Sequence, residues 1–387
     1  MNVFKGPESL TQYYDPDQNP PLPLVEIPKR LNPLREDGVR IFAKILTALP
    51  AQNVKSLPVL NMLQQDPDIR SKPLAEASSG STAISLGVIA RALWGHEDVH
   101  AHVSNKKPIS QMKLLRLFGI SVDLFGGMTQ PTYDDPKGIM GRLRNRATQK
   151  GDIFNPGQYH NENNWKSHIR WTGPQIVRQL PEINVFSATV GTGGCVVGNG
   201  KYIKAKKPST TILGVFNAHG DTTPGPRHLP GMDCAPFAQE IFETIDCYEI
   251  VKSVDSFRTS MSLCRNGIIC GPSSGEALHG LLAYLKKQQA AGRLGDLAEP
   301  ETGETNCVFI CADLPYQYVD LYHAKLPEDE FPKIYNEELL ACDLDVYDDR
   351  YHLTPPLLID LLDRGNLITS IFCQGLVSGI QLRFILA

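Results

Sequence analysis

The sequence predicts an α/β protein with open, mainly parallel sheets. Short apolar runs alternate with helical patterns, the connections between them are short and polar, and small-residue turns follow several of the runs. This alternation is typical of parallel sheets, because each crossover helix returns the chain to the same edge. At roughly 150 residues per domain, the 387 residues predict two to three domains.

Short apolar runs predict strands at residues 39–44, 99–103, 121–125, 185–189, 211–216 and 308–310. Helical patterns lie at residues 59–64, 82–93, 110–117, 173–179 and 275–287. A further apolar run at 267–270 precedes a turn of small residues, and we expect a strand there as well.

The two ends of the chain differ in character from the middle. Residues 1–22 are polar and proline-rich, which predicts a flexible N-terminal arm without the apolar segment of a secretory signal. An acidic stretch begins near Pro327, and a punctuated helical pattern follows from Thr354 to Gly365. Residues 327–387 are therefore expected to form a separate C-terminal tail.

Composition excludes several classes of protein. The chain is 42% hydrophobic and 21% charged with a net charge of -4, so no basic excess points to nucleic acid or to a membrane surface. The nine cysteines are odd in number and form no CxxC pair, which favours free thiols over a disulfide framework. We expect no metal site, no membrane span and a cytoplasmic location.

Lys55 is the first candidate for chemistry. It lies in a turn-rich link at the start of a predicted helix, where a positive charge opposes the helix dipole. A solvated lysine is the ordinary interpretation. A Schiff base with an aldehyde is the functional one, since that chemistry uses a lysine with a shifted pKa.

Three small-residue turns are the other candidates, at residues 77–82, 190–195 and 271–275. The first turn could be an ordinary helix cap or could bind an anion. The third could likewise be a helix cap, or its serine could face the ring nitrogen of a bound heterocycle. The second contains three glycines in four positions after a strand, which suits either a structural turn or a backbone that wraps an anion. Its spacing matches neither the dinucleotide nor the ATP phosphate loop.

In order, these segments resemble the cysteine synthase/cystathionine β-synthase family of pyridoxal-phosphate enzymes, the fold type II or tryptophan synthase β-like class. The resemblance runs from about residue 22 to residue 310. Asn53-Val54-Lys55 resembles S-V-K-D-R, and residues 78–82 resemble T-S-G-N-T-G. Residues 157–176 resemble Q-F-x-N-P…T-G-P-E-I, and residues 191–195 resemble G-T-G-G-T. Residues 224–231 resemble P-G-P-H-x-I-Q-G, and residues 271–275 resemble G-I-S-S-G.

The resemblance implies a role for each matching residue. Lys55 is the catalytic lysine that binds the cofactor and moves the α-proton. The cofactor-binding residues are Lys55, Ser81, Gly191, Thr192, Gly193, Gly194, Cys195 and Ser273, and the substrate-binding residues are Ser78, Ser79, Thr82 and Gln158. Ser81 stands where the family has asparagine, and Cys195 stands where it has threonine.

The resemblance also implies two α/β domains with pyridoxal 5'-phosphate in the cleft between them. The large domain comprises residues 23–59 and 166–326, and the small domain, residues 60–165, is inserted into it and closes over the substrate. Residues 351–365 are similar to the opening helix of a rhodanese-like domain, which makes the 327–387 tail a candidate truncated fusion.

The implied reaction is β-replacement or β-elimination on a serine-derived amino acid through an aminoacrylate, with a thiol or other nucleophile as the second substrate. Such an enzyme is a cysteine synthase-like or cystathionine β-synthase-like transferase or lyase, and a homodimer. Two alternatives stay open: a serine/threonine dehydratase on the same scaffold, and a catalytically inactive binding protein. The sequence specifies neither the leaving group nor the nucleophile.

Overall fold

The computed structural model describes residues 3–65, 71–127, 132–335, 337 and 340. The chain divides into two units, residues 1–326 and residues 327–387. In the second unit, the described part contains the 3-10 helix η10 (Glu328–Glu330). The helix expected at residues 354–365, on which the rhodanese-like resemblance rests, lies outside the described residues.

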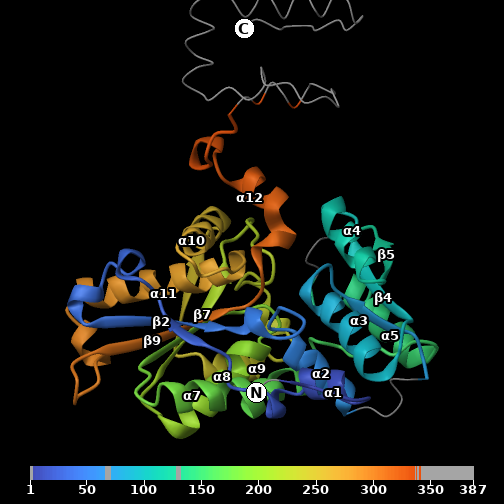
Figure 1. The fold of residues 1–387 in the computed structure, drawn as a ribbon, viewed down its shortest axis with the longest axis horizontal. Helices are drawn as coiled ribbons and strands as arrows, with labels where there is room; N and C mark the ends of the chain where they lie inside the picture. The colour runs from blue at the N-terminus through green and yellow to red at the C-terminus, as the bar shows by residue number, and fades with distance from the viewer. Residues whose placement is uncertain (1–2, 66–70, 128–131, 336, 338–339, 341–387) are drawn as a thin grey trace, which may run out of the picture. The chain divides into compact units, whose positions relative to one another are not determined.

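A six-stranded sheet forms the centre of the first unit (Figure 1). Its order is β1-β2-β9-β6-β7-β8, and every neighbouring pair is parallel except β1 and β2. The strands are β1 (Leu24–Glu26), β2 (Val39–Ile45), β6 (Val185–Thr189), β7 (Thr211–Asn217), β8 (Cys247–Val251) and β9 (Thr305–Cys311). The parallel register aligns Val39 with Thr305, and Val185 with Cys307.

A second, smaller sheet is also parallel, with the order β3-β4-β5. Its strands are β3 (Leu74–Ala77), β4 (Val99–Ser104) and β5 (Ser121–Phe125). Three helices gather around it in Figure 1, namely α3 (Ser81–Trp94), α4 (Ile109–Leu117) and α5 (Ile139–Gln149). The two sheets, both mainly parallel, agree with the predicted α/β class.

Helices cover both faces of the large sheet (Figure 1). One face is covered by α10 (Ser253–Arg265) and α11 (Pro272–Ala290), and the other by α7 (Gly173–Gln179), α8 (Gly194–Lys206) and α9 (Ala238–Thr244). Successive side chains of β9 point to opposite faces of the sheet, so this strand contributes to the core on both sides. Phe309 packs in the cluster of α11, whereas Val308 and Ile310 pack in the cluster of α8.

Shorter elements complete the first unit. The remaining helices are α1 (Ser9–Tyr14), α2 (Ser56–Gln64), α6 (Asn163–Ser167), the π-helix η6 (His168–Thr172) and α12 (Val319–Lys325). Single 3-10 turns are η1 (Pro16–Gln18), η2 (Lys29–Leu31), η3 (Arg35–Asp37), η4 (Leu46–Ala48), η7 (Met232–Cys234), η8 (Leu294–Leu297) and η9 (Pro315–Tyr318).

The N-terminal segment is folded onto the body of the first unit, where the sequence predicted a flexible arm. Asp17 accepts hydrogen bonds from the side chains of Arg170 (2.7 Å) and Trp171 (3.1 Å). The buried ammonium of Lys44 donates to the carbonyl oxygen of Leu22 at 2.7 Å. Composition alone could not reveal these distant partners.

The strand expected at residues 267–270 is absent, so that prediction is wrong. Helix α10 ends at Arg265, and Gly267 turns the chain with a φ of +91°. The carbonyl oxygen of Cys270 accepts from Ser260 Oγ at 2.8 Å and from the thiol of Cys264 at 3.3 Å. The Ile268 N–H donates to the carbonyl oxygen of Leu263 at 3.0 Å, so these backbone groups find their partners in α10 and not in a neighbouring strand.

Candidate active site

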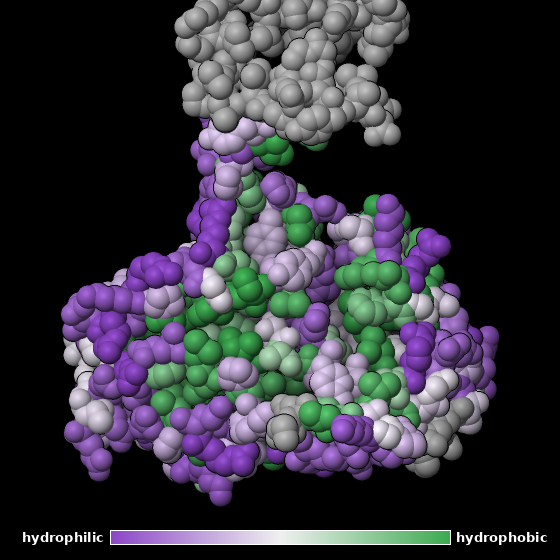
Figure 2. Space-filling view, viewed as in Figure 1, coloured by the Kyte–Doolittle hydropathy of each residue, from purple (hydrophilic) through white to green (hydrophobic). Residues whose placement is uncertain are grey.

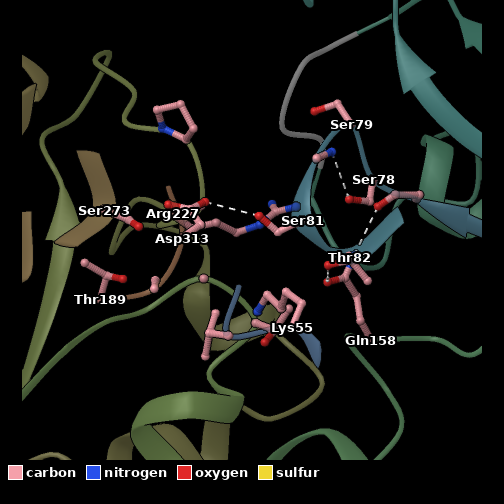
Figure 3. Close-up of a pocket in the computed structure, with 18 of the residues that line it drawn as sticks. Lys55, Ser78, Ser79, Ser81, Thr82, Gln158, Thr189, Arg227, Ser273 and Asp313 are labelled. Carbon is pink, nitrogen blue, oxygen red and sulfur yellow. Dashed lines mark hydrogen bonds between the residues drawn. The ribbon is translucent and has the colours of Figure 1, made fainter. Parts of the chain in front are cut away.

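A pocket opens where the carboxyl ends of parallel strands from both sheets converge (Figure 3). The connections that follow β2, β3, β6, β7 and β9 all contribute to its wall, together with the N-terminus of α11. The carboxyl edge of an open parallel sheet is the usual location of ligand sites, because the connecting loops meet there. Figure 2 shows the mixed polar and apolar surface over this part of the molecule.

The pocket collects eleven of the twelve site residues predicted from the sequence: Lys55, Ser78, Ser79, Ser81, Thr82, Gln158, Gly191, Thr192, Gly193, Cys195 and Ser273. Gly194 does not line the pocket but begins α8 directly behind the glycine turn. Residues separated by more than 200 positions in the sequence thus line one pocket, which is what a single site requires.

Lys55 is held at the start of α2 by its own turn. Its backbone N–H donates to Asn53 Oδ1 at 2.9 Å, and the neighbouring Val54 N–H donates to the carbonyl oxygen of Ala312 at 2.6 Å. Burial lowers the pKa of the Lys55 amine, and nearby Cys195 and Asp313 oppose this change. A lowered pKa increases the fraction of neutral amine, which is the nucleophilic form.

The turn from Gly191 to Gly194 is built so closely that side chains are excluded. A Cβ at Gly191 would lie 2.5 Å from the carbonyl oxygen of Gly225, and one at Gly194 would lie 2.0 Å from Asn164 Oδ1. Gly193 has a φ of +86°, a conformation that favours glycine. The turn leads into the 13-residue helix α8, whose first N–H groups and dipole favour an anion.

Thr192 is the one residue of this turn with a functional side chain, and it is buried. Its hydroxyl accepts from Asn164 Nδ2 at 3.0 Å and from the Gly194 N–H at 3.3 Å. Within the described part of the chain, Oδ1 of the buried Asn164 has no hydrogen-bond partner. The hydroxyl is therefore fixed in place at the base of the turn.

A second turn, Ser78 to Thr82, joins β3 to α3 on the opposite wall (Figure 3). Thr82 donates its hydroxyl proton to Gln158 Oε1 at 2.8 Å, and Gln158 Nε2 donates to the carbonyl oxygen of Ala77 at 3.2 Å. Ser78 Oγ accepts from the Gly80 N–H at 3.3 Å. The turn thus presents hydroxyl groups and the N-terminus of a 14-residue helix to the pocket.

Glu76 supports this turn from beneath. Its two carboxylate oxygens accept from three backbone N–H groups, those of Ala77 (3.0 Å), Gly157 (3.0 Å) and Gln158 (3.3 Å). Burial raises the pKa of Glu76 to about 7, although the hydrogen bonds oppose this change. The carboxylate therefore holds Gln158 against the turn without lining the pocket itself.

Ser273 lies on the third wall, in the first turn of α11, and is buried. The start of this helix is fixed to the end of β9, because the Ala312 N–H donates to Ser274 Oγ at 2.9 Å. A Cβ on Gly225 would lie 3.6 Å from that of Ser273, so the loop after β7 packs directly over this serine.

A sequence model described as "Pyridoxal-phosphate dependent enzyme" matches residues 17–296, well over half of the chain. This chain belongs to the pyridoxal-phosphate-dependent enzyme family. The predicted family, fold class and cofactor are thereby confirmed. Among the described residues of this pyridoxal-phosphate-dependent enzyme, no helix is both long and apolar enough to span a bilayer.

Cysteine synthases are among the most similar curated relatives. That of Aquifex aeolicus is 28% identical over 297 residues, which cover 73% of this chain and 86% of the relative. Cysteine synthase B of Salmonella typhimurium is 29% identical over 282 residues, with 70% and 86% covered. The pyridoxal-phosphate-dependent enzyme described here is therefore of the cysteine synthase-like type.

Solved structures agree with this fold. O-ureido-L-serine synthase superposes with a TM-score of 0.65 at 18% identity and covers 84% of this chain and 98% of its own. O-acetyl serine sulfhydrylase isoform 3 from Entamoeba histolytica gives a TM-score of 0.60 at 23% identity, with 81% and 92% covered.

Sequence reasoning missed several charged residues of the pocket, above all Asp313. Its Oδ2 accepts from Ser81 Oγ (3.1 Å), Gln317 Nε2 (3.1 Å) and the Tyr318 hydroxyl (2.6 Å). Burial raises the pKa of Asp313 to about 6. The signal was present, since Asp313 follows a predicted strand at its carboxyl end. Ser81 also acquires a partner that its place in a small-residue turn did not suggest.

Proposed function

We propose that this enzyme catalyses β-replacement on a serine-derived amino acid, with Lys55 as the residue that binds the cofactor and moves the α-proton. One observation carries the proposal: the amine of Lys55 shares a single pocket with the glycine turn at residues 191–194 and the hydroxyl turn at residues 78–82. A site of this kind can hold an anionic cofactor and an amino acid carboxylate on either side of one nucleophilic amine.

The chain's own residues fit pyridoxal phosphate. In this proposal Gly191, Thr192, Gly193 and Gly194 hold the phosphate, and Ser273 meets the ring nitrogen, with Ser81 and Cys195 beside the cofactor. Support comes from the crowding around the glycines, since any side chain there would displace the backbone that approaches the phosphate. When bound, pyridoxal phosphate supplies an electron sink for the bonds broken at Cα.

Ser78, Ser79, Thr82 and Gln158 bind the substrate carboxylate in this proposal. The hydrogen bond between Thr82 and Gln158 supports it, because it joins the two segments that must grip the same carboxylate. Binding there orients the amino acid with its α-proton toward Lys55.

Lys55 then takes the α-proton, and the β-substituent leaves with the electron pair of its bond to Cβ. The thiol or other nucleophile provides the electron pair of the new bond to Cβ, and Lys55 returns a proton to Cα. A neutral hydroxyl at Ser273 leaves the cofactor ring less electron-withdrawing than an acidic partner would, which favours loss of the β-substituent.

The domain organisation follows from the same proposal. Residues 60–165, which contain the three-stranded sheet, act as a small domain inserted between residues 23–59 and 166–326. Its hydroxyl turn closes on the substrate carboxylate and excludes water. We further propose that the enzyme is a homodimer, which light scattering of the purified protein tests. We also propose a cytoplasmic location.

Substitution of Lys55 by alanine tests the function. The Lys55→Ala variant should lose turnover and the visible absorption of a protein-bound cofactor, whereas Lys286→Ala, at an exposed position of α11, should keep both. Full activity in Lys55→Ala would refute the role of this lysine. Product analysis with and without an added thiol separates β-replacement, which yields a thioether or thiol amino acid, from a dehydratase, which yields a keto acid.

A further inference from the structure

His102 is the one histidine among the described residues that line the pocket, and the proposed reaction does not use it. It lies near the carboxyl end of β4, and the next two residues, Val103 and Ser104, line the same pocket. Its side chain is 20% exposed, so a ligand can reach the ring. An imidazole at this place is a candidate to move protons in the pocket, because its ordinary pKa lies near neutrality.

A carboxylate stands beside this imidazole on the neighbouring strand β5. The parallel register of the small sheet sets His102 opposite Asp123, so the two side chains share one face of the sheet. Nε2 of His102 lies 3.6 Å from Oδ2 of Asp123. The negative charge favours a proton on Nε2, which leaves Nδ1 as the ring nitrogen that can accept another.

His100 holds Asp123 from the same strand as His102. It precedes His102 by two residues and therefore lies on the same face of the sheet. Its Nδ1 lies 2.8 Å from Oδ2 of Asp123, and its Nε2 lies 2.9 Å from Oδ1 of Asp98. The strand thus carries one histidine that fixes the carboxylate and a second whose ring that carboxylate orients, an arrangement that suits a general base.

The surroundings of His102 favour its neutral form. Burial lowers the pKa of His102, Arg146 and His100 lower it further, and Asp123 opposes this change. Arg146 belongs to α5, which packs on β3 and β4 (Figure 1), and it is itself bound to Asp152 at 3.0 to 3.1 Å. The neutral imidazole is the form that can accept a proton at neutral pH.

The proposed reaction requires a second proton acceptor besides Lys55. A nucleophile such as a neutral thiol brings a proton into the pocket and must lose it as its bond to Cβ forms. In the proposed function Lys55 holds the α-proton that it later returns to Cα, so it is not free to take this one. His102 supplies an acceptor in the same pocket, with a carboxylate beside it to stabilise the imidazolium.

We propose that His102 is the base that accepts the proton of the incoming nucleophile, with Asp123 stabilising the imidazolium and His100 positioning Asp123. This inference rests on the proposed function and specifies the second substrate as a nucleophile that arrives protonated. For a thiol, the S–H bond breaks and its proton passes to Nδ1 of His102. The electron pair left on sulfur forms the new bond to Cβ, and the imidazolium then releases the proton to solvent.

The test gives the holoenzyme two small nucleophiles that differ in protonation, each with O-acetylserine. At about pH 8, sulfide is mainly the hydrosulfide anion and needs no base, whereas 2-mercaptoethanol is mainly the neutral thiol. The variants are His102→Gln and Asp123→Asn. His96→Gln is the control, since His96 precedes the same strand, lies 3.2 Å from the carbonyl oxygen of Asp98 and does not line the pocket.

We expect His102→Gln to lower kcat/KM for 2-mercaptoethanol by about a hundredfold, in line with the loss of a general base, and to leave kcat/KM for sulfide unchanged. The loss should shrink as the pH rises above about 8.5, because the thiolate then forms without a base. Asp123→Asn should show the same selectivity with a smaller loss, and His96→Gln should show no loss. Departure of the β-substituent without a nucleophile, followed by stopped-flow absorbance, should keep its wild-type rate in His102→Gln.

Three results would overturn the role of His102 while leaving the proposed function intact. The first is a wild-type enzyme that uses sulfide but not 2-mercaptoethanol, and the second is an equal effect of His102→Gln on both nucleophiles. The third is a loss on 2-mercaptoethanol that does not change with pH. Failure of the function itself looks different, because neither nucleophile would then give a replacement product. Asp123→Asn keeps the test available should His102→Gln fail to fold.

Discussion

Replacing Asp313 by asparagine separates the charge of this residue from its hydrogen bonds. Oδ2 accepts all three of its bonds, from Ser81, Gln317 and Tyr318, and Oδ1 has no partner among the described residues. An asparagine can keep its carbonyl oxygen at the Oδ2 position and place its amide nitrogen at the other. The substitution therefore removes the buried charge with little change in geometry.

The magnitude follows from the pKa of Asp313, which burial raises from 3.8 to about 6. At about 1.36 kcal/mol per pKa unit, this difference corresponds to about 3 kcal/mol. Between these two pKa values the folded protein binds a proton that the unfolded chain has released. The contribution of Asp313 to stability is therefore fully present below pH 3.8 and is lost as the pH rises through about 6.

The assay is chemical unfolding of the wild type and Asp313→Asn at a series of pH values between about 4 and 7. The free energy of unfolding of Asp313→Asn, relative to the wild type, should rise by about 3 kcal/mol across this range. Asp313→Ala is the contrasting variant, since it leaves the hydroxyls of Ser81 and Tyr318 without their acceptor, at a cost of about 1–3 kcal/mol for each.

A functional readout accompanies the stability measurement. The negative charge of Asp313 raises the pKa of Lys55 against the effect of burial, so its removal should lower that pKa. The rate at which apoenzyme takes up pyridoxal phosphate should then reach its maximum at a lower pH in Asp313→Asn, because attack requires the neutral amine. Identical pH dependences of stability in wild type and Asp313→Asn would refute the reasoning.

Two further substitutions address the buried lysine and the glycine turn. Burial lowers the pKa of Lys44 from 10.5 to about 7, so its contribution to stability is lost as the pH falls toward 7. The free energy of unfolding of the wild type relative to Lys44→Met should therefore rise by up to about 5 kcal/mol between pH 7 and 10.5, and a constant difference would contradict this. Gly193→Ala should weaken cofactor binding and destabilise the fold by more than Gly231→Ala. Both glycines have a φ near +85°, but of the two only Gly193 would bring a Cβ against a neighbour, Ile241 at 2.5 Å. Equal effects of the two substitutions in thermal unfolding and in cofactor titration would refute the crowding argument.

The strands β6 and β9 could be predicted because their apolar runs are buried on both faces, and β5 was predicted with its observed bounds although most of it is exposed. β6 was predicted with its observed bounds, and β9 is buried along its whole length. The strands β1, β3 and β8 escaped detection because they are short or expose alternate residues, as Tyr248 does in β8. Local pattern also misled at residues 267–270, where Ser260 of α10, and not a neighbouring strand, donates to the carbonyl oxygen of Cys270.

The sequence by itself determined which turns could carry chemistry, because the requirements of such turns are local. A backbone that approaches an anion needs glycines such as Gly193, and a helix that receives a carboxylate begins with small hydroxyl residues such as Thr82. Only the tertiary structure decided which charges surround the amine. Ser81 and Asp313 lie 232 positions apart, and Lys107 and Arg227 come from different sheets, so no local pattern relates them. Strand order selects the loops that meet at the carboxyl edge of each sheet, and both edges contribute residues to the one pocket.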